Sequence, residues 1–237
     1  MNILVTNDDG INAKGIELLV KTVLKYGNVT VVAPKYEQSA KSHSLNLRKK
    51  MKLEKLDDYI CEAYVLDSTP ADCVRVAKNY LHKDFDIVLS GVNEGYNAGD
   101  DIFYSGTVAA ACEGIIQGAK GVAISTDYYC LDKINEGLKL SLEYIFEKGL
   151  LDNWSLYNIN IPPFSNDAKF TIQGAMHYDC EIVNDGSDLI ALGKPRKDNL
   201  IKNSDIECIY NNYISITPLN YNRTNFQVYE KLINLYK

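Results

Sequence analysis

Residues 3–10 read Ile-Leu-Val-Thr-Asn-Asp-Asp-Gly, so a short apolar run is followed almost at once by two adjacent carboxylates. A continuous apolar run of this kind is typical of a strand that is covered on both faces of a parallel sheet. Such sheets present ligands to the loops at the carboxyl ends of their strands. The stretch therefore predicts an α/β fold with Asp8 and Asp9 at the functional edge of its sheet. The alternative is an ordinary polar turn, which the tripeptide Asp-Asp-Gly alone favours.

Outward from this stretch, strand and helix signals alternate as far as residue 150. The predicted buried strands are the apolar runs at 29–33, 59–66, 86–90 and 121–126. The predicted helices carry apolar residues three or four positions apart, at 16–24, 70–81, 107–117 and 134–145. This alternation predicts a doubly wound, mostly parallel, Rossmann-like sheet with right-handed crossovers.

The last third of the chain has a different pattern. Short strands are predicted at 155–161, 170–175, 180–183, 189–192 and 214–216. Asp185-Gly186 is a hairpin signal, and the apolar spacing after residue 225 predicts a closing helix. We therefore predict a Rossmann-like catalytic region over residues 1–150 and a C-terminal antiparallel β extension with a closing helix over 151–237. The extension is expected to cover the site or join subunits rather than to fold as an independent domain.

Composition excludes several classes of partner. The chain of 237 residues has a formal net charge of -6, and its basic residues are spread along the sequence. The sequence therefore shows no cluster of basic residues of the kind that binds polymeric nucleic acid. No signal-peptide pattern and no apolar stretch of about 18 residues is found, and the six cysteines lack zinc-ligand or disulfide spacing. We expect a cytoplasmic protein that makes no contact with membranes.

Three polar loops follow predicted buried strands and can meet at one edge of the sheet. Their polar side chains are Asn7, Asp8 and Asp9 in the first loop, Ser39 and Ser42 in the second, and Asn93, Asn97 and Asp100 in the third. All offer hard oxygen ligands, which suit Mg²⁺, Mn²⁺ or Ca²⁺ and are poor ligands for zinc or copper. Two charged ligands and several neutral ones leave positions open for water and substrate phosphate, as a catalytic cation requires.

The segment 104–111 reads Tyr-Ser-Gly-Thr-Val-Ala-Ala-Ala and predicts the start of a helix. Ser105 or Thr107 would cap this helix, whose first N–H groups and positive dipole end attract an anion. Gly106 would let the backbone approach a ligand closely. The alternative is an ordinary N-cap before an Ala-rich helix that packs on the sheet.

Together these motifs resemble the survival-protein-E (SurE) nucleotidases. The motifs that carry the resemblance are Asn7–Gly10, Gly91–Gly95, Asn97–Asp101 and Tyr104–Ala110, with supporting matches at Val32–Pro34, Thr69–Val74 and Ser215–Leu219. They span nearly the whole chain in the expected order. Departures occur at Gln38-Ser39-Ala40, where relatives read Arg-Ser-Gly, and at Asn12–Gly15, where they commonly read His-Ala-Pro-Gly. These departures concern substrate preference and loop shape.

The resemblance implies a metal-dependent phosphatase that acts on nucleoside 5′- and 3′-monophosphates. It implies one divalent cation per subunit, most simply Mg²⁺ or Mn²⁺, held by Asp8, Asp9, Ser39 and Asn93. Relatives pair through their C-terminal segments, so a homodimer or homotetramer is expected. The base preference and a side activity on polyphosphate are left open by the sequence.

The expected reaction is attack of a metal-activated water on the phosphoryl group. Asp8 and Asp9 are the predicted catalytic residues, because either can bind the cation and accept a proton from that water. The residues predicted to contact phosphate or substrate are Asn7, Asn93, Asn97, Ser105, Gly106 and Thr107. An aspartyl-phosphate formed on Asp8 is the rival route.

Neighbouring side chains are assigned lesser roles. Tyr96 and Tyr104 lie in the glycine-rich loop, where they either stack on a base or only line the cleft. Asp100 and Asp101 resemble a second metal pair, but the family resemblance implies that they order the loop. Glu113 is expected to hold a structural hydrogen bond within its helix.

Two alternatives of other classes stay open. One is a nucleotide-binding regulator that uses the same loops without turnover. The other is a metal-dependent glycosyltransferase, in which Asp8 and Asp9 would bind a nucleotide sugar and no free phosphate would form. A dinucleotide oxidoreductase is disfavoured, because the first strand is not followed by G-x-G-x-x-G.

Overall fold

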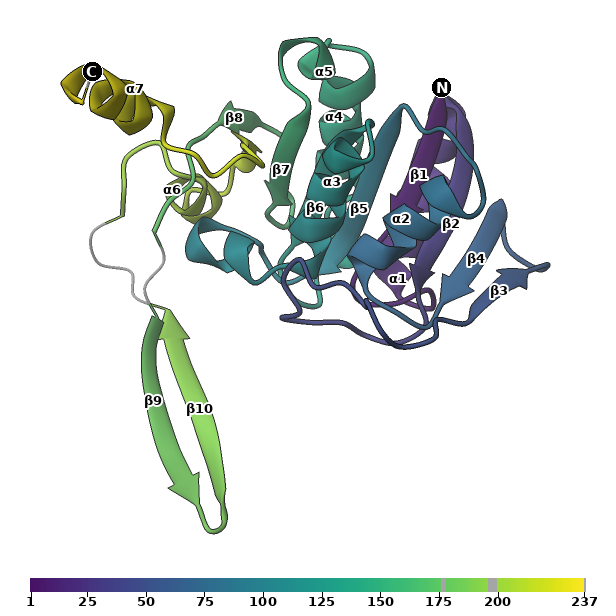
Figure 1. The fold of residues 1–237 in the computed structure, drawn as a ribbon, viewed down its shortest axis with the longest axis horizontal. Helices are drawn as coiled ribbons and strands as arrows, with labels where there is room; N and C mark the ends of the chain where they lie inside the picture. Colours follow the sequence, from purple (N-terminus) through teal and green to yellow (C-terminus); the bar gives the residue numbers. More distant parts are fainter. Residues whose placement is uncertain (176–177, 196–199, 237) are drawn as a thin grey trace.

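The computed structural model describes residues 1–175, 178–195 and 200–236. Within these ranges the chain forms a nine-stranded sheet in the order β3-β4-β2-β1-β5-β6-β7-β11-β8 (Figure 1). Its strands are β1 (Asn2–Thr6), β2 (Asn28–Pro34), β3 (Leu53–Leu56), β4 (Glu62–Leu66), β5 (Ile87–Glu94), β6 (Lys120–Thr126), β7 (Leu156–Ile161), β8 (Ala168–Phe170) and β11 (Ile214–Pro218).

The centre of this sheet is parallel. Strands β4, β2, β1, β5, β6 and β7 all pair with their neighbours in parallel register. Antiparallel pairing occurs only toward the two edges, where β3 pairs with β4 and β11 pairs with β7. The predicted doubly wound, mostly parallel sheet is confirmed.

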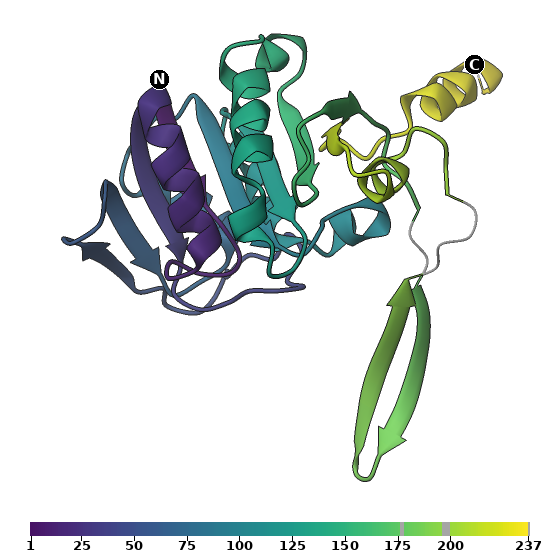
Figure 2. The same cartoon turned by 180° about the vertical axis from the view of Figure 1, so that it is seen from behind.

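Helices cover both faces of the sheet. The helices of the described residues are α1 (Lys14–Val23), α2 (Pro70–Asn79), α3 (Gly106–Ile116), α4 (Asn135–Phe146), α5 (Leu150–Asn153), α6 (Asp205–Tyr210) and α7 (Phe226–Leu235), with short 3₁₀ turns η1 (Leu24–Tyr26), η2 (Gly99–Phe103) and η3 (Leu131–Lys133). Figure 1 shows α2 and α3 in front of the sheet, and Figure 2 shows α1 and α4 on the opposite face.

Two hydrophobic clusters explain why β1 must be apolar at consecutive positions. Ile3 and Val5 pack with residues of α1 and α4, whereas Leu4 packs on the other face with residues of α2 and α3. Side chains alternate between the faces of a strand, so a strand covered on both sides needs an uninterrupted apolar run. All three side chains are fully buried.

The C-terminal third contains both confirmed and incorrect predictions. The predicted hairpin is present as β9 (Tyr178–Asp185) and β10 (Asp188–Pro195), and Gly186 supplies a positive φ of 76° in its turn. The strand predicted at 170–175 is wrong beyond Phe170, because the chain leaves the sheet there and Ile172 forms only an isolated bridge to Ser204. Strand β3 and helix α6 were not predicted.

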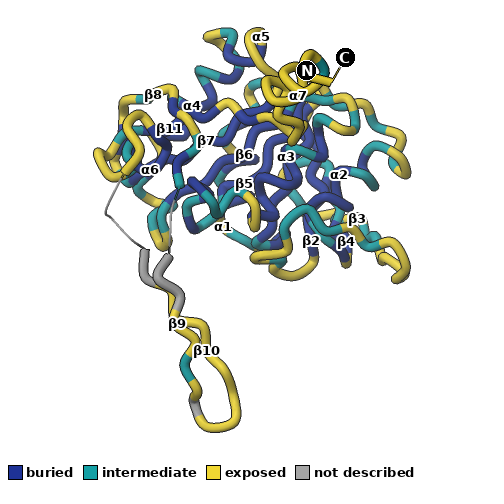
Figure 3. Tube along the Cα trace, turned by 60° about the vertical axis from the view of Figure 1, so that its left-hand side comes forward, coloured by how far each residue is buried: buried dark blue, intermediate teal, exposed yellow. Residues whose placement is uncertain are grey.

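The hairpin and α7 extend away from the body of the molecule (Figure 1). Figure 3 shows α7 and the coloured part of the hairpin as mostly exposed, in contrast to the buried strands of the sheet. No residue of α7 is buried. None of the helices in the described parts of the chain has the length and apolar character needed to cross a bilayer.

Candidate active site

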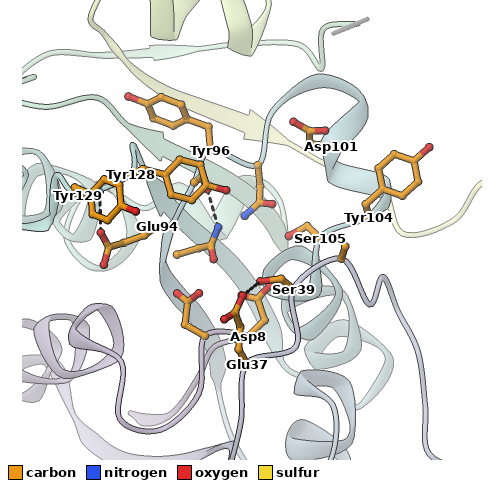
Figure 4. Close-up of a pocket in the computed structure, with 15 residues that line it drawn as sticks. Asp8, Glu37, Ser39, Glu94, Tyr96, Asp101, Tyr104, Ser105, Tyr128 and Tyr129 are labelled. Carbon is orange, nitrogen blue, oxygen red and sulfur yellow. Dashed lines mark hydrogen bonds between the residues drawn. The ribbon is translucent and has the colours of Figure 1, made fainter. Parts of the chain in front are cut away.

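A cavity of about 500 Å³ opens at the carboxyl ends of β1, β2, β5 and β6 (Figure 4). Each of these strands is followed by a loop that contributes to its wall. The lining residues are Asp8, Asp9, Glu37, Ser39, Ala40, Asn93, Glu94, Gly95, Tyr96, Asn97, Asp101, Tyr104, Ser105, Tyr128 and Tyr129. All four predicted cation ligands are therefore brought to one cavity, which stands where the fold predicted a ligand site.

The loop after β1 is shaped by Asn7. Its Nδ2 donates to the carbonyl of Gly10 (2.9 Å), and its Oδ1 accepts from the N–H of Gly10 (3.2 Å). Asn7 is fully buried and does not line the cavity. These bonds close a tight turn at Gly10, whose φ is +100°, and the turn presents Asp8 and Asp9 to the cavity.

The N-terminus of α3 contacts Asp8 directly. Ser105 caps the helix, since its Oγ accepts from the N–H of Val108 (3.0 Å). The Thr107 hydroxyl hydrogen-bonds Asp8 Oδ1. A Cβ at Gly106 would lie 2.9 Å from Asp8 Cβ and 3.0 Å from its Oδ2, so only glycine permits this approach. Gly106 and Thr107 thus reach the site through Asp8, whereas Ser105 lines the cavity itself.

The loop after β2 brings one serine into the cavity. Ser39 Oγ donates to Glu37 Oε1 (2.5 Å), and both residues line the cavity, whereas Ser42 and Ser44 do not. The loop is fastened to its surroundings by the N–H of Gln38, which donates to the carbonyl of Asp8 (2.7 Å). Of Ser39, Ser42 and Ser44, only Ser39 lines the cavity, and Figure 4 shows it on the same side as Asp8 and Glu37.

The third polar loop begins inside β5 rather than after it. Strand β5 runs to Glu94 with an irregularity between Ser90 and Asn93, so Asn93 pairs with Ser125 in the sheet. Asn93 Nδ2 donates to the carbonyl of Gly95 (2.6 Å), and Asn93 Oδ1 takes no part in this bond. The amide group is thereby oriented by its nitrogen, and its oxygen is the atom suited to a cation.

Asn97 is held by polar side chains of the neighbouring strands. Its N–H donates to Asn160 Oδ1 (3.0 Å) and its Nδ2 donates to Ser125 Oγ (2.8 Å). Its carbonyl accepts from Nδ2 of Asn158 (2.6 Å) and of Asn160 (3.0 Å). The two asparagines of β7 were missed at the sequence level, although polar residues within a buried strand were a signal for them.

The cavity is strongly acidic. Five of its lining residues are carboxylates, namely Asp8, Asp9, Glu37, Glu94 and Asp101, and none of the described lining residues is Lys, Arg or His. Burial raises the pKa of Asp8, which is only 5% exposed. Burial, and then the charge of Asp8, raises the pKa of Asp9 to about 7. Two adjacent carboxylates with raised pKa values form an environment that a cation would stabilise.

The donor set fits a hard divalent cation. Asp8, Asp9, Ser39 and Asn93 supply carboxylate, hydroxyl and amide oxygens around the same cavity. Across the described ranges, no group of three or more His, Cys, Asp or Glu side chains is arranged to hold a metal. A cation here would therefore depend on two carboxylates and neutral oxygens, which is the mixture that the sequence predicted.

Several lining residues were not predicted. Tyr128 and Tyr129 follow β6, and Glu37 and Glu94 complete the acidic wall. Only their position in the sequence could have indicated these residues, because each lies just beyond or at the end of a predicted buried strand. Glu113 lies away from the cavity, where its Oε1 accepts from Gln117 Nε2 (2.7 Å) and its Oε2 contacts His43 Nε2 (2.8 Å).

Comparisons with known proteins identify the family of the chain. The family model described as "Survival protein SurE" matches residues 3–180 of the chain. The chain belongs to the SurE family. Its curated relatives include the "5'-nucleotidase SurE" of Clostridium botulinum (strain Alaska E43 / Type E3), 38% identical, with 96% of each chain covered. That of Clostridium beijerinckii (strain ATCC 51743 / NCIMB 8052) is 36% identical, with 100% of each chain covered.

A solved member of the SurE family has the same fold. The structure titled "Crystal Structure of Sure Protein from Aquifex aeolicus" superposes with a TM-score of 0.84 at 31% sequence identity, and 100% of each chain is covered. The similarity therefore includes the C-terminal region as well as the central sheet.

Proposed function

We propose that this SurE-family protein is a divalent-cation-dependent nucleotidase that hydrolyses nucleoside 5′- and 3′-monophosphates to nucleoside and phosphate. The observation that carries the proposal is the pair Asp8 and Asp9, which lies against the N-terminus of α3 in a cavity without described basic lining residues. Phosphate cannot approach five carboxylates unless positive charge is supplied there. The names of the curated relatives support the 5′-nucleotidase activity.

Four side chains are proposed to hold one Mg²⁺ or Mn²⁺ per subunit, namely Asp8, Asp9, Ser39 and Asn93. The Ser39 hydroxyl donates a hydrogen bond to Glu37, and the Asn93 amide nitrogen donates one to Gly95. The side-chain oxygens of Ser39 and Asn93 therefore keep lone pairs for a cation. When bound, such a cation polarises a phosphoryl oxygen and lowers the pKa of a bound water.

The phosphate is proposed to lie beside Ser105, at the start of α3. The backbone N–H groups of the first helical turn and the positive end of the helix dipole stabilise negative charge there. Asn93 and Asn97 line the same cavity and are proposed to contact substrate. Gly106 and Thr107 contribute through the helix start, and Asn7 contributes by shaping the loop that carries the two aspartates.

The two aspartates are proposed to differ in their proton chemistry. Asp8 is nearly buried, and its Oδ1 is occupied by the Thr107 hydroxyl. Asp9 lines the cavity and is less buried. We therefore assign proton acceptance from the attacking water to the Asp9 carboxylate, and orientation of the cation to Asp8.

The covalent alternative, an aspartyl-phosphate on Asp8, is separated from water attack by the stereochemical course at phosphorus and by trapping of a phosphoenzyme. Direct attack of water inverts the configuration of a phosphoryl group made chiral with oxygen isotopes and leaves no phosphoenzyme. Retention of configuration, which results from two successive displacements, or a trapped phosphoenzyme would establish the covalent route.

The activity itself is tested by phosphate release from a panel of nucleoside monophosphates with Mg²⁺, with Mn²⁺ and with EDTA. We expect release that depends on the cation and falls by about 1,000-fold in Asp8→Asn. Nucleoside 3′-monophosphates belong in the same panel, since activity on them is part of the proposal. Polyphosphate is added to test the side activity that the sequence leaves open. If no nucleotide is hydrolysed with either cation, the nucleotidase proposal fails.

A homodimer or homotetramer is proposed from the exposed apolar surface of the C-terminal region. Helix α7 exposes Phe226, Val228, Tyr229, Leu232 and Leu235, each by 46% or more. A second copy of the chain is the proposed partner of this surface, since amphipathic helices bury their apolar face. Light scattering coupled to size exclusion tests this, and a monomer at micromolar concentration would contradict it.

Residues 1–150 are proposed to carry the catalytic groups, because all lining residues of the cavity lie between positions 8 and 129. Residues 151–237 are proposed not to fold alone, since β7, β11 and β8 are hydrogen-bonded into the same sheet. The cytoplasm is the proposed compartment, in which the five described free cysteines would stay reduced. Cell fractionation tests the location.

A further inference from the structure

The nucleoside part of the proposed substrate must be recognised without basic side chains. The cavity wall consists largely of carboxylates and tyrosines, and no Lys or Arg is among its described lining residues. A carboxylate attracts neither a phosphate nor the π-face of a base. The tyrosines Tyr96, Tyr104, Tyr128 and Tyr129 are therefore the side chains with surface suited to a neutral aromatic heterocycle.

Among these tyrosines, Tyr128 has the best-supported position. Gly95, whose φ is +127°, lies against the phenol end of the Tyr128 ring. A Cβ at position 95 would be 2.8 Å from both Cζ and Oη of Tyr128. The ring therefore occupies space that only a glycine at position 95 leaves free. The N–H of Gly95 donates to the carbonyl of Thr126 (2.9 Å), which fixes the glycine beside β6.

Tyr128 nevertheless keeps most of its surface free. It is 64% exposed while it lines the cavity. Figure 4 shows Tyr128 and Tyr104 on opposite sides, with Asp8 and Ser39 below and between them. The ring is thus supported at one end and open toward the place above the acidic pair where a nucleoside would extend from its phosphate.

The other tyrosines are less suited to this role. Tyr129 is 88% exposed, and it is held by its backbone N–H, which donates to Glu94 Oε2 (2.9 Å). Tyr96 is partly buried, so less of its ring is available. Tyr104 stands on the opposite rim, away from the Gly95 backbone that supports the ring of Tyr128.

We propose that Tyr128 is the base-stacking residue of this protein, so that it selects nucleoside monophosphates over sugar phosphates that lack a base. This inference rests on the proposed nucleotidase function. Purines are favoured over pyrimidines, because the larger ring system covers more of the tyrosine face.

The test compares AMP with ribose 5-phosphate, which differs from AMP by the missing base. The readout is the ratio of kcat/KM for AMP to kcat/KM for ribose 5-phosphate. In Tyr128→Leu, which keeps apolar bulk without an aromatic face, we expect this ratio to fall about 10- to 100-fold. In Tyr128→Phe, which keeps the ring, the ratio stays within about twofold of wild type. Tyr80→Ala is the matched control, because Tyr80 is 68% exposed and lies outside the cavity.

Several outcomes would overturn the proposal. An unchanged ratio in Tyr128→Leu, an equal loss on both substrates, or a larger fall of the ratio in Tyr129→Ala would each do so. Calorimetric binding of adenosine gives a readout that does not need turnover, and Tyr128→Leu should weaken it by a similar factor. If wild type binds adenosine through Tyr128 but hydrolyses no nucleotide, the proposed function fails and the base site stands. If wild type hydrolyses AMP and the ratio is insensitive to Tyr128, the base site fails and the function stands.

Discussion

The edge of the sheet around Asp8 and the C-terminal region around α7 differ in how their side chains are satisfied. At the sheet edge, polar groups are bonded to one another, as in the contacts of Asn7 with Gly10 and of Thr107 with Asp8. In α7, apolar side chains remain exposed and no residue is buried. In the first region these polar contacts are made within one chain. The second region presents apolar surface that a single chain leaves uncovered.

The largest expected effect breaks the acidic pair. Asp9→Asn removes the proposed proton acceptor and one of the two charges proposed to hold the cation, so kcat/KM for AMP should fall by about 1,000-fold. Steady-state phosphate release with saturating Mn²⁺ measures it. Asp152→Asn is the control, since the Asp152 side chain is 83% exposed and remote from the cavity. Activity within tenfold of wild type would remove Asp9 from the proposed machinery.

The next effect concerns the support of Asp8. Thr107→Val deletes the hydroxyl that bonds Asp8 Oδ1 while keeping the shape of the side chain. We expect kcat/KM to fall about 10- to 100-fold and the cation concentration for half-maximal rate to rise. Thr107→Ser, which restores a hydroxyl, should recover most of both quantities. Equal behaviour of the two variants would show that the hydroxyl does not orient Asp8.

A charge on α7 tests whether a second copy of the chain covers the exposed apolar surface of this helix. Leu232→Glu places a carboxylate on the exposed apolar surface, where Leu232 itself is 48% exposed. If a second copy covers this surface, self-association should weaken by about 100-fold, because a buried charge would replace buried apolar area. Sedimentation equilibrium measures the dissociation constant. Lys231→Glu is the control, since it changes charge on the same helix without removing an apolar residue.

A smaller effect is expected at Asp205 in α6, which bonds η2 to the segment before the hairpin. One oxygen accepts from the N–H of Gly99 (2.9 Å) at the start of η2, and the other accepts from the N–H of Gly174 (2.8 Å) before the hairpin. Asp205→Asn turns one acceptor into a donor against a buried N–H, so the free energy of unfolding should fall by about 2 kcal/mol. Thermal unfolding should shift by about 6 °C. No shift would show that solvent or a rotated amide satisfies these N–H groups.

The smallest effect concerns pH and the cation-free protein. The pKa of Asp9 is about 7 in the folded chain and has an ordinary value of 3.8, so the folded state loses stability as pH rises from about 4 to 7. In EDTA at pH 8, the free energy of unfolding of Asp9→Asn should therefore be about 1 kcal/mol higher than that of wild type. Its Tm should be roughly 3 °C higher. At pH 4 the two proteins should unfold together. A variant that is less stable at pH 8 would contradict this sign.

The two regions also differed in how well the sequence predicted them. The alternation of Ile3, Leu4 and Val5 between two clusters follows from strand geometry alone, so β1 and its site loop could be predicted locally. The end of β8 could not, because it depends on Ile172 turning toward Ser204, which lies 32 positions along the chain. The hairpin was predicted correctly from its own turn residues.

The same distinction holds within the site. Polar loops after apolar runs predicted a cation site, and the family resemblance implied that Asp8, Asp9, Ser39 and Asn93 are its ligands. The structure brings these four residues to one cavity. Tyr128 was not predicted, because its position depends on the positive φ of Gly95, which follows strand β5. Local sequence reports which residues follow a strand, but not which of them a distant glycine will support.

The contact between Asp8 and Thr107 has a consequence for the order in which the protein forms. These residues are 99 positions apart, and their hydrogen bond exists only after α3 has docked on the sheet beside β1. Contacts of such long sequence separation form late, since loop closure must precede them. During refolding, helical circular dichroism should therefore return before cation binding does, and cation binding becomes a reporter of the last packing step.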